Sequence, residues 1–187
     1  MQSNHQTIGG FLIFAGSGLF LLGMIIAEAR YPGYSVSQNM ISDLGIGPTA
    51  LLFNSVTVLY GLATIASVSS IRHSLRSVVF PILLGLSGIG VLGVGLFPEN
   101  LGRIHDISAA TAFVFGSLAA IYASRILLTP FRYLSGYLGT FSIVAVLLFV
   151  IGSYHGLGPG GMERMVAYPI IIWSMGLGGA LMKPLRT

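Results

Sequence analysis

The chain has 187 residues, of which 54 % are hydrophobic and only 7 % are charged, and its formal net charge is +4 at pH 7. A soluble domain carries about a quarter of its residues as Asp, Glu, Lys and Arg, so this composition excludes a soluble enzyme. The absence of cysteine excludes disulfide frameworks, thiolate metal centres and thiol nucleophiles. Any metal ligand must therefore come from His, Asp, Glu or Met.

Six stretches of the chain are long and apolar enough to cross a membrane. A spanning helix needs about 20 mainly apolar residues, because the hydrocarbon core is roughly 30 Å thick. Backbone polar groups find no water in lipid, so we expect helices throughout. The predicted helices cover residues 8–27, 49–71, 78–97, 104–128, 133–154 and 165–182. The sequence thus predicts an all-α, multi-pass bundle of six transmembrane helices in the cell membrane, forming a single domain over residues 1–187.

The charged residues predict how this bundle is oriented. Loops that face the cytoplasm carry an excess of Lys and Arg. One end of the predicted bundle holds six basic residues and no acid, namely Arg72, Arg76, Arg125, Arg132, Lys183 and Arg186. The other end holds Arg30, Arg103 and Arg164 together with all five acids, namely Glu28, Asp43, Glu99, Asp106 and Glu163. We therefore expect both termini to be cytoplasmic and the acids to gather at the external face.

The longest predicted external loop joins the first two helices, over residues 29–48. A structureless loop of this length is usually functional or disordered. Its tyrosines are typical of the membrane interface, and Met40, Ile41 and Leu44 predict a short amphipathic helix lying over the bundle. We expect this loop to cover a site at the external face.

Two of the following helices carry small or polar residues with a packing role. In the second helix, Asn54 predicts a hydrogen bond to a neighbouring helix, with ligand contact as the alternative. Small residues let helices approach closely in lipid. The third helix is rich in them, with Gly85, Gly88, Gly90, Gly93 and Gly95.

Two histidines lie at the external ends of predicted helices. His105 begins the fourth helix and His155 ends the fifth, so an antiparallel hairpin brings both to the same depth. On the fourth helix, Ala109, Ala112 and Gly116 follow His105 along one face. That face either packs against a neighbouring helix or leaves a flat cavity for a planar ligand.

One hypothesis for these residues is a membrane b-type cytochrome. Neutral imidazoles of His105 and His155 can ligate the iron of haem b from opposite sides. Arg30, Arg103 and Arg164 can then pair with the haem propionates, since a guanidinium binds a carboxylate with two hydrogen bonds. Such a protein exchanges electrons with a quinone or an external redox partner.

Two other hypotheses remain open. A zinc-dependent hydrolase of lipid-like substrates would use His105, His155 and Asp106 as metal ligands. Its candidate catalytic carboxylates are Glu99, Glu163 and Asp43. Neither the haem nor the zinc hypothesis has a sequence signature, since the haem motif C-x-x-C-H and the zinc motif H-E-x-x-H do not occur. A transporter or ligand-binding membrane protein would instead use the arginines and acids as gating pairs. The lipid bilayer is the expected partner in every case, and no nucleic acid is expected.

Short motifs at the external helix ends resemble a known family. They are YPGY at 31–34, ISDLG at 41–45, FP at 97–98 with His105 shortly after, and GMER at 161–164. With these motifs, nearly the whole chain is similar to the small prokaryotic membrane proteins of the domain of unknown function 998. The resemblance implies a six-helix integral membrane protein with marked positions at the outer helix ends. It implies no activity.

Overall fold

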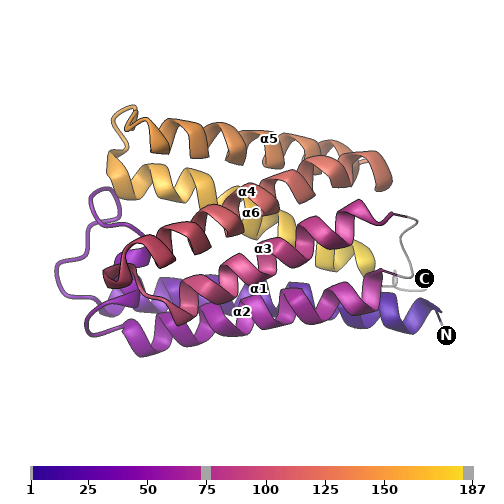
Figure 1. The fold of residues 1–187 in the computed structure, drawn as a ribbon, viewed down its shortest axis with the longest axis horizontal. Helices are drawn as coiled ribbons and strands as arrows, with labels where there is room; N and C mark the ends of the chain where they lie inside the picture. The colour runs from indigo at the N-terminus through magenta and orange to yellow at the C-terminus, as the bar shows by residue number, and fades with distance from the viewer. Residues whose placement is uncertain (1, 73–76, 183–187) are drawn as a thin grey trace.

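The computed structural model describes residues 2–72 and 77–182, and in these ranges it is helical without strands (Figure 1). The long helices are α1 (Gln2–Arg30), α2 (Ala50–Ile71), α3 (Val79–Leu96), α4 (Arg103–Ile126), α5 (Phe131–Val150) and α6 (Gly158–Leu181). Two short 3-10 helices, η1 (Ser42–Gly45) and η2 (Glu99–Leu101), lie in the connections. All six long helices are apolar enough to span a membrane, which confirms the predicted multi-pass architecture.

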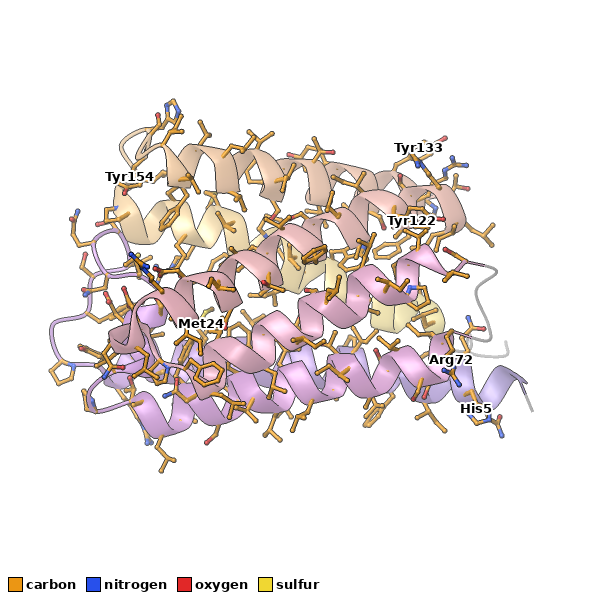
Figure 2. All side chains as sticks on the ribbon, viewed as in Figure 1. His5, Met24, Arg72, Tyr122, Tyr133 and Tyr154 are labelled. Carbon is orange, nitrogen blue, oxygen red and sulfur yellow. The ribbon has the colours of Figure 1, made fainter. Side chains whose placement is uncertain are left out.

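The helices pack in chain order, and α6 closes the bundle against α1. α6 is the most enclosed helix, since 61 % of its most apolar stretch is buried, whereas α5 has 28 % buried. We call the end at which α1 begins and α6 ends the inner end. Figure 2 shows His5 and Arg72 at the inner end and Tyr154 at the opposite, outer end. The predicted basic residues Arg76, Lys183 and Arg186 lie outside the described ranges.

Glycines let the helix backbones touch. A Cβ atom on Gly10 of α1 would lie 2.6 Å from the carbonyl oxygen of Gly178 on α6, and one on Gly178 would lie 2.6 Å from the Gly10 oxygen. On α3, a Cβ on Gly90 would lie 2.2 Å from the amide nitrogen of Ala112. Such contacts hold helices together in lipid, where apolar burial gives little association energy. The predicted packing role of these glycines is confirmed, although Gly85 faces almost open space.

The start of α6 differs from the prediction. The helix begins at Gly158 rather than at residue 165, so the glycine-rich run is part of the helix and not a break. Pro159 is tolerated because the first helical turn has no intrahelical use for its amide hydrogen. The neighbouring glycines have a packing reason, since a Cβ on Gly160 would lie 2.0 Å from the Asn39 carbonyl oxygen. This first turn is therefore shaped to receive the loop between α1 and α2.

The inner half of the bundle is filled with large side chains. Phe80 and Trp173 meet edge to face at 6.4 Å between ring centroids, and Ile13, Leu84 and Leu177 are buried around them. A separate cluster fills the outer half, where the rings of Phe20, Phe53 and Tyr60 pack together. A cavity lined by residues from five of the six long helices lies in this outer half.

Candidate functional site

A cavity of about 70 Å³ lies in the outer half of the bundle. Residues of α1, η1 with the preceding Ile41, α2, α3, α4 and α6 line it, and α5 contributes none. The wall is mostly apolar, and its polar lining residues are Ser42, Thr57, Tyr60, Ser87, His105 and Glu163. Sites that enclose a drug-sized molecule are larger, about 300–1,000 Å³. This cavity therefore has room for a small molecule or for one end of a longer one.

The deeper hydroxyl groups of the cavity donate their hydrogens within the protein. Tyr60 Oη donates to Ser174 Oγ at 2.8 Å, Ser87 Oγ donates to the Ala112 carbonyl at 2.9 Å, and Thr57 Oγ1 donates to the Phe53 carbonyl at 2.7 Å. The polar groups best placed to meet a ligand are consequently those at the outer end of the cavity.

A segment that we call the strap, residues 31–45, covers this outer end. It appears in purple at the left of Figure 1. Its η1 helix contains the buried Leu44, and Ile41 and Ser42 line the cavity below. The predicted short helix is present only as this four-residue 3-10 helix, which contains Leu44 but neither Met40 nor Ile41. The loop between α1 and α2 does lie over a cavity, as expected.

Arg164 of α6 holds the strap against the bundle through hydrogen bonds. Its Nη1 donates to the carbonyls of Val36 at 3.0 Å, Asn39 at 3.1 Å and Gly160 at 2.8 Å. Its Nη2 donates to Glu28 Oε1 of α1 and, at 2.7 Å, to Tyr34 Oη. The ion pair joins the buried Arg164, whose side chain is 3 % exposed, to the half-buried Glu28, whose side chain is 17 % exposed. Arg164, which the cytochrome hypothesis assigns to a propionate, thus directs its terminal nitrogens to the protein itself.

Tyr34 completes this connection as a neutral phenol. Burial raises its pKa to about 12, although the adjacent Arg164 guanidinium acts in the opposite direction. Tyr34 therefore keeps its proton at physiological pH. It donates that proton to the Met40 carbonyl at 2.8 Å while its oxygen accepts from Arg164.

Further hydrogen bonds hold the two halves of the strap. The first half meets α6, where the amide of Gly160 donates to the Ser37 carbonyl at 3.0 Å. The second half meets α2, where Asn54 Nδ2 donates to the Gly45 carbonyl at 3.0 Å. Asn54 was expected to bond a neighbouring helix, and its partner is instead the strap backbone. The strap is consequently fastened on two sides of the cavity.

Three predicted carboxylates converge beside the cavity. Glu163 accepts a hydrogen bond from the Ile41 amide. The charge of Arg164 acts on it, and those of Glu99 and Asp43 act in the opposite sense. Asp43 Oδ2 accepts from the Met40 amide at 2.9 Å and from Asn39 Nδ2 at 3.0 Å. These side chains come from α6, η1 and η2, so the fold gathers acids that are far apart in the sequence.

Glu99 is the least satisfied of these acids. Burial raises its pKa; Ser42 acts in the opposite direction, the Asp43 charge reinforces the rise, and His105 lowers the pKa. Its Oε2 atom is buried and has no hydrogen-bond partner among the described residues. Glu99 does not line the cavity, so this unpartnered acceptor lies among the residues around its outer end.

Only one of the two candidate histidines belongs to the cavity. His105 is buried, and its Nδ1 lies 2.8 Å from the Phe97 carbonyl. Because a carbonyl only accepts, Nδ1 must carry the hydrogen, and Nε2 is then an acceptor in the neutral ring. His155 is exposed in the turn after α5, with a left-handed φ of 48°, and it does not line the cavity.

The remaining candidate residues also lie apart from the cavity lining. Arg30, Arg103 and Asp106 are exposed. Within the described part of the chain, no group of three or more His, Cys, Asp and Glu side chains is arranged to hold a metal ion. Binding of haem or zinc through these residues stays a prediction.

Comparison with known proteins gives one match. A family model described as protein of unknown function (DUF998) matches residues 14–180, which include the strap and every polar residue of the cavity lining. The chain belongs to this family. No curated protein and no solved structure matches it. Membership of DUF998 confirms the resemblance noted in the motifs, and the function has to be argued from the site.

Proposed function

We propose that this DUF998 protein binds a small amphipathic molecule in the outer cavity, as a ligand-binding protein or transporter of the cell membrane. The observation that carries the proposal is the position of the cavity, which lies directly under a strap held by hydrogen bonds from the ion-paired Arg164. The strap is then the gate, and the Glu28–Arg164 pair is its latch. The positions of the basic residues support an outer end that faces away from the cytoplasm.

The distribution of polarity in the cavity supports an amphipathic ligand. The wall includes the side chains of Phe20, Phe53 and Phe113, which stabilise apolar groups by removing them from water. Glu163 and His105 are the ionisable residues of the lining. A few well-placed polar groups in an apolar pocket fix the orientation of a ligand. The ligand would therefore lie with its apolar part against the aromatic wall and its polar part under the strap.

The packing of the inner half supports binding from the outer side. Of the inner cluster of buried side chains, only Ile170 also lines the cavity. Phe80, Trp173 and Leu177 fill the bundle below it. A transporter would have to rearrange these side chains to open an inner path, whereas a ligand-binding protein needs only the strap to move.

The cytochrome and zinc-hydrolase hypotheses receive less support from the site. One observation is compatible with the first, since ligating histidines commonly donate their second ring N–H to a carbonyl, as His105 does to Phe97. The cavity of about 70 Å³ and the outward position of His155 place the ligand-binding hypothesis first. An absorption spectrum and a metal analysis of one purified sample would test both of the others.

A matched pair of variants tests the proposed function. Ala109 lines the cavity, and its neighbour Ala110 is exposed on the same helix. Ala109→Leu fills the cavity, and Ala110→Leu adds the same atoms to the lipid-facing surface. We expect a panel of hexyl amphiphiles, measured by calorimetry on purified protein in detergent, to include a ligand whose affinity falls at least tenfold in Ala109→Leu alone. If no member of the panel binds, or if both variants bind like the wild type, the proposal is wrong.

A further inference from the structure

The polar end of the cavity carries an excess of negative charge. Glu163 of α6 is the acidic residue of the lining. The charges of Asp43 on η1 and Glu99 on η2 act on Glu163 from outside the lining. His105 of α4 is the one basic side chain of the lining, which includes no Lys or Arg.

The nearest guanidinium does not neutralise these acids by direct contact. Arg164 follows Glu163 in the chain, but its terminal nitrogens donate to Glu28, to Tyr34 and to backbone carbonyls. Its ion-pair partner is the Glu28 carboxylate of α1. The charge of Arg164 also acts on Glu163, but neither Nη1 nor Nη2 donates a hydrogen bond to that carboxylate.

The acids at the cavity are short of hydrogen-bond donors. A buried carboxylate is costly unless it is paired or hydrogen-bonded. Glu163 receives one backbone hydrogen bond, from Ile41. Glu99 Oε2 receives none within the described residues, although it is buried. The missing component at this end is a positively charged donor.

We infer that the cavity selects amphipathic molecules whose polar end is an ammonium group. This inference rests on the proposed function and names the class of its ligand. An ammonium group has three donors and no acceptor, which complements carboxylates that only accept. The alkyl part would then lie along the aromatic wall. The ammonium group could come from a free alkylamine or from the headgroup of an ethanolamine lipid.

The test compares ligands that differ only in the polar end. Hexylamine, hexanol and hexanoate are titrated into the purified full-length protein at neutral pH. We expect hexylamine to bind at least tenfold more tightly than hexanol, and hexanoate to show no measurable binding. Glu163→Gln should weaken hexylamine at least tenfold and leave hexanol unchanged. The control Asp106→Asn removes an exposed acid of α4 and should change neither affinity.

A second variant keeps the test decisive if Glu163→Gln fails to fold. A comparison of two lipids distinguishes a free amine from a lipid headgroup as the source of the ammonium group. Glu99→Gln should also lower the hexylamine affinity, because it removes a half-buried acid whose charge acts on Glu163. In nanodiscs, phosphatidylethanolamine weakens hexylamine binding relative to phosphatidylcholine if the lipid headgroup is the natural ligand, and it has no such effect if a free amine is. Equal affinities for hexylamine and hexanol, or an unchanged preference in folded Glu163→Gln and Glu99→Gln, would overturn the inference while leaving the cavity as a binding site. If the wild-type protein binds none of the three ligands, hexanol included, the proposed function is overturned as well.

Discussion

The latch, in which Arg164 pairs with Glu28 and also holds the strap, should make a large contribution to stability, and Arg164→Met tests it. The variant keeps much of the length of the side chain and removes its charge and its donors. Glu28 would then be left as a half-buried carboxylate without its cation, and three strap or helix carbonyls would lose a donor.

Two estimates set the size of the effect. Hydrogen bonds to charged groups contribute about 1.5–3 kcal/mol each, but five of them cannot be summed, since the strap can lift and become hydrated. Removing one partner of a buried ion pair costs about 3–5 kcal/mol. We therefore expect Arg164→Met to lower the free energy of unfolding by about 3–5 kcal/mol. Glu28→Gln keeps an oxygen that can accept from Arg164 and should cost less, about 1–2 kcal/mol.

The assay is SDS-induced unfolding in mixed micelles, followed by circular dichroism. Arg103→Met is the matched control, because Arg103 is exposed at the same end of the bundle; it should change stability by less than about 0.5 kcal/mol. A double-mutant cycle with Glu28→Met and Arg164→Met should show a coupling of about 0.5–3 kcal/mol. A loss below about 1 kcal/mol for Arg164→Met, or strictly additive effects in the cycle, would refute the latch.

Two further predictions concern the first turn of α6 and the acid cluster. Gly160→Ala should lower the free energy of unfolding by about 1–3 kcal/mol in the same assay, because its Cβ would lie 2.0 Å from the Asn39 carbonyl oxygen. The control Gly179→Ala adds a Cβ to open space on the same helix and should be neutral or stabilising. A neutral Gly160→Ala would contradict the close contact. The folded state raises the pKa of Glu99 above its ordinary 4.5, so the stability provided by the neutral carboxyl is full below that value and is lost as the pH rises through the raised pKa. Glu99→Gln has no carboxyl to ionise and does not lose this stability. The melting temperature of the variant should therefore rise relative to that of the wild type as the pH increases. If the two melting temperatures change with pH in parallel, the pKa of Glu99 is not raised.

The sequence was sufficient to predict the architecture and the region of the site. Hydropathy located all six helices, because lipid requires long apolar helical stretches. The gathering of every acid at one end predicted where Asp43, Glu99 and Glu163 would meet. The start of α6 was missed because a Gly-Pro-Gly-Gly run normally ends a helix, and its packing against the strap has no local signal.

The pairings within the site were not predictable. Glu28 and Arg164 are 136 residues apart, and their contact depends on which faces α1 and α6 turn toward each other. The helical hairpin predicted that His155 lies at the outer end of the bundle. Its exposure depends on a turn in which His155 itself has a positive φ, and the sequence has no signal for that turn. The small-residue face of α4 was ambiguous for a good reason. Ala109 and Ala112 line the cavity, while Gly116 packs against Ser87.

The most direct test of the account is the affinity of hexylamine for Ala109→Leu and Ala110→Leu, measured side by side by calorimetry. The two alanines are neighbours on α4, and only Ala109 lines the cavity. The account predicts an affinity at least tenfold weaker for Ala109→Leu and an unchanged affinity for Ala110→Leu. Equal affinities for the two variants would show that the amine binds somewhere other than the cavity beneath the strap.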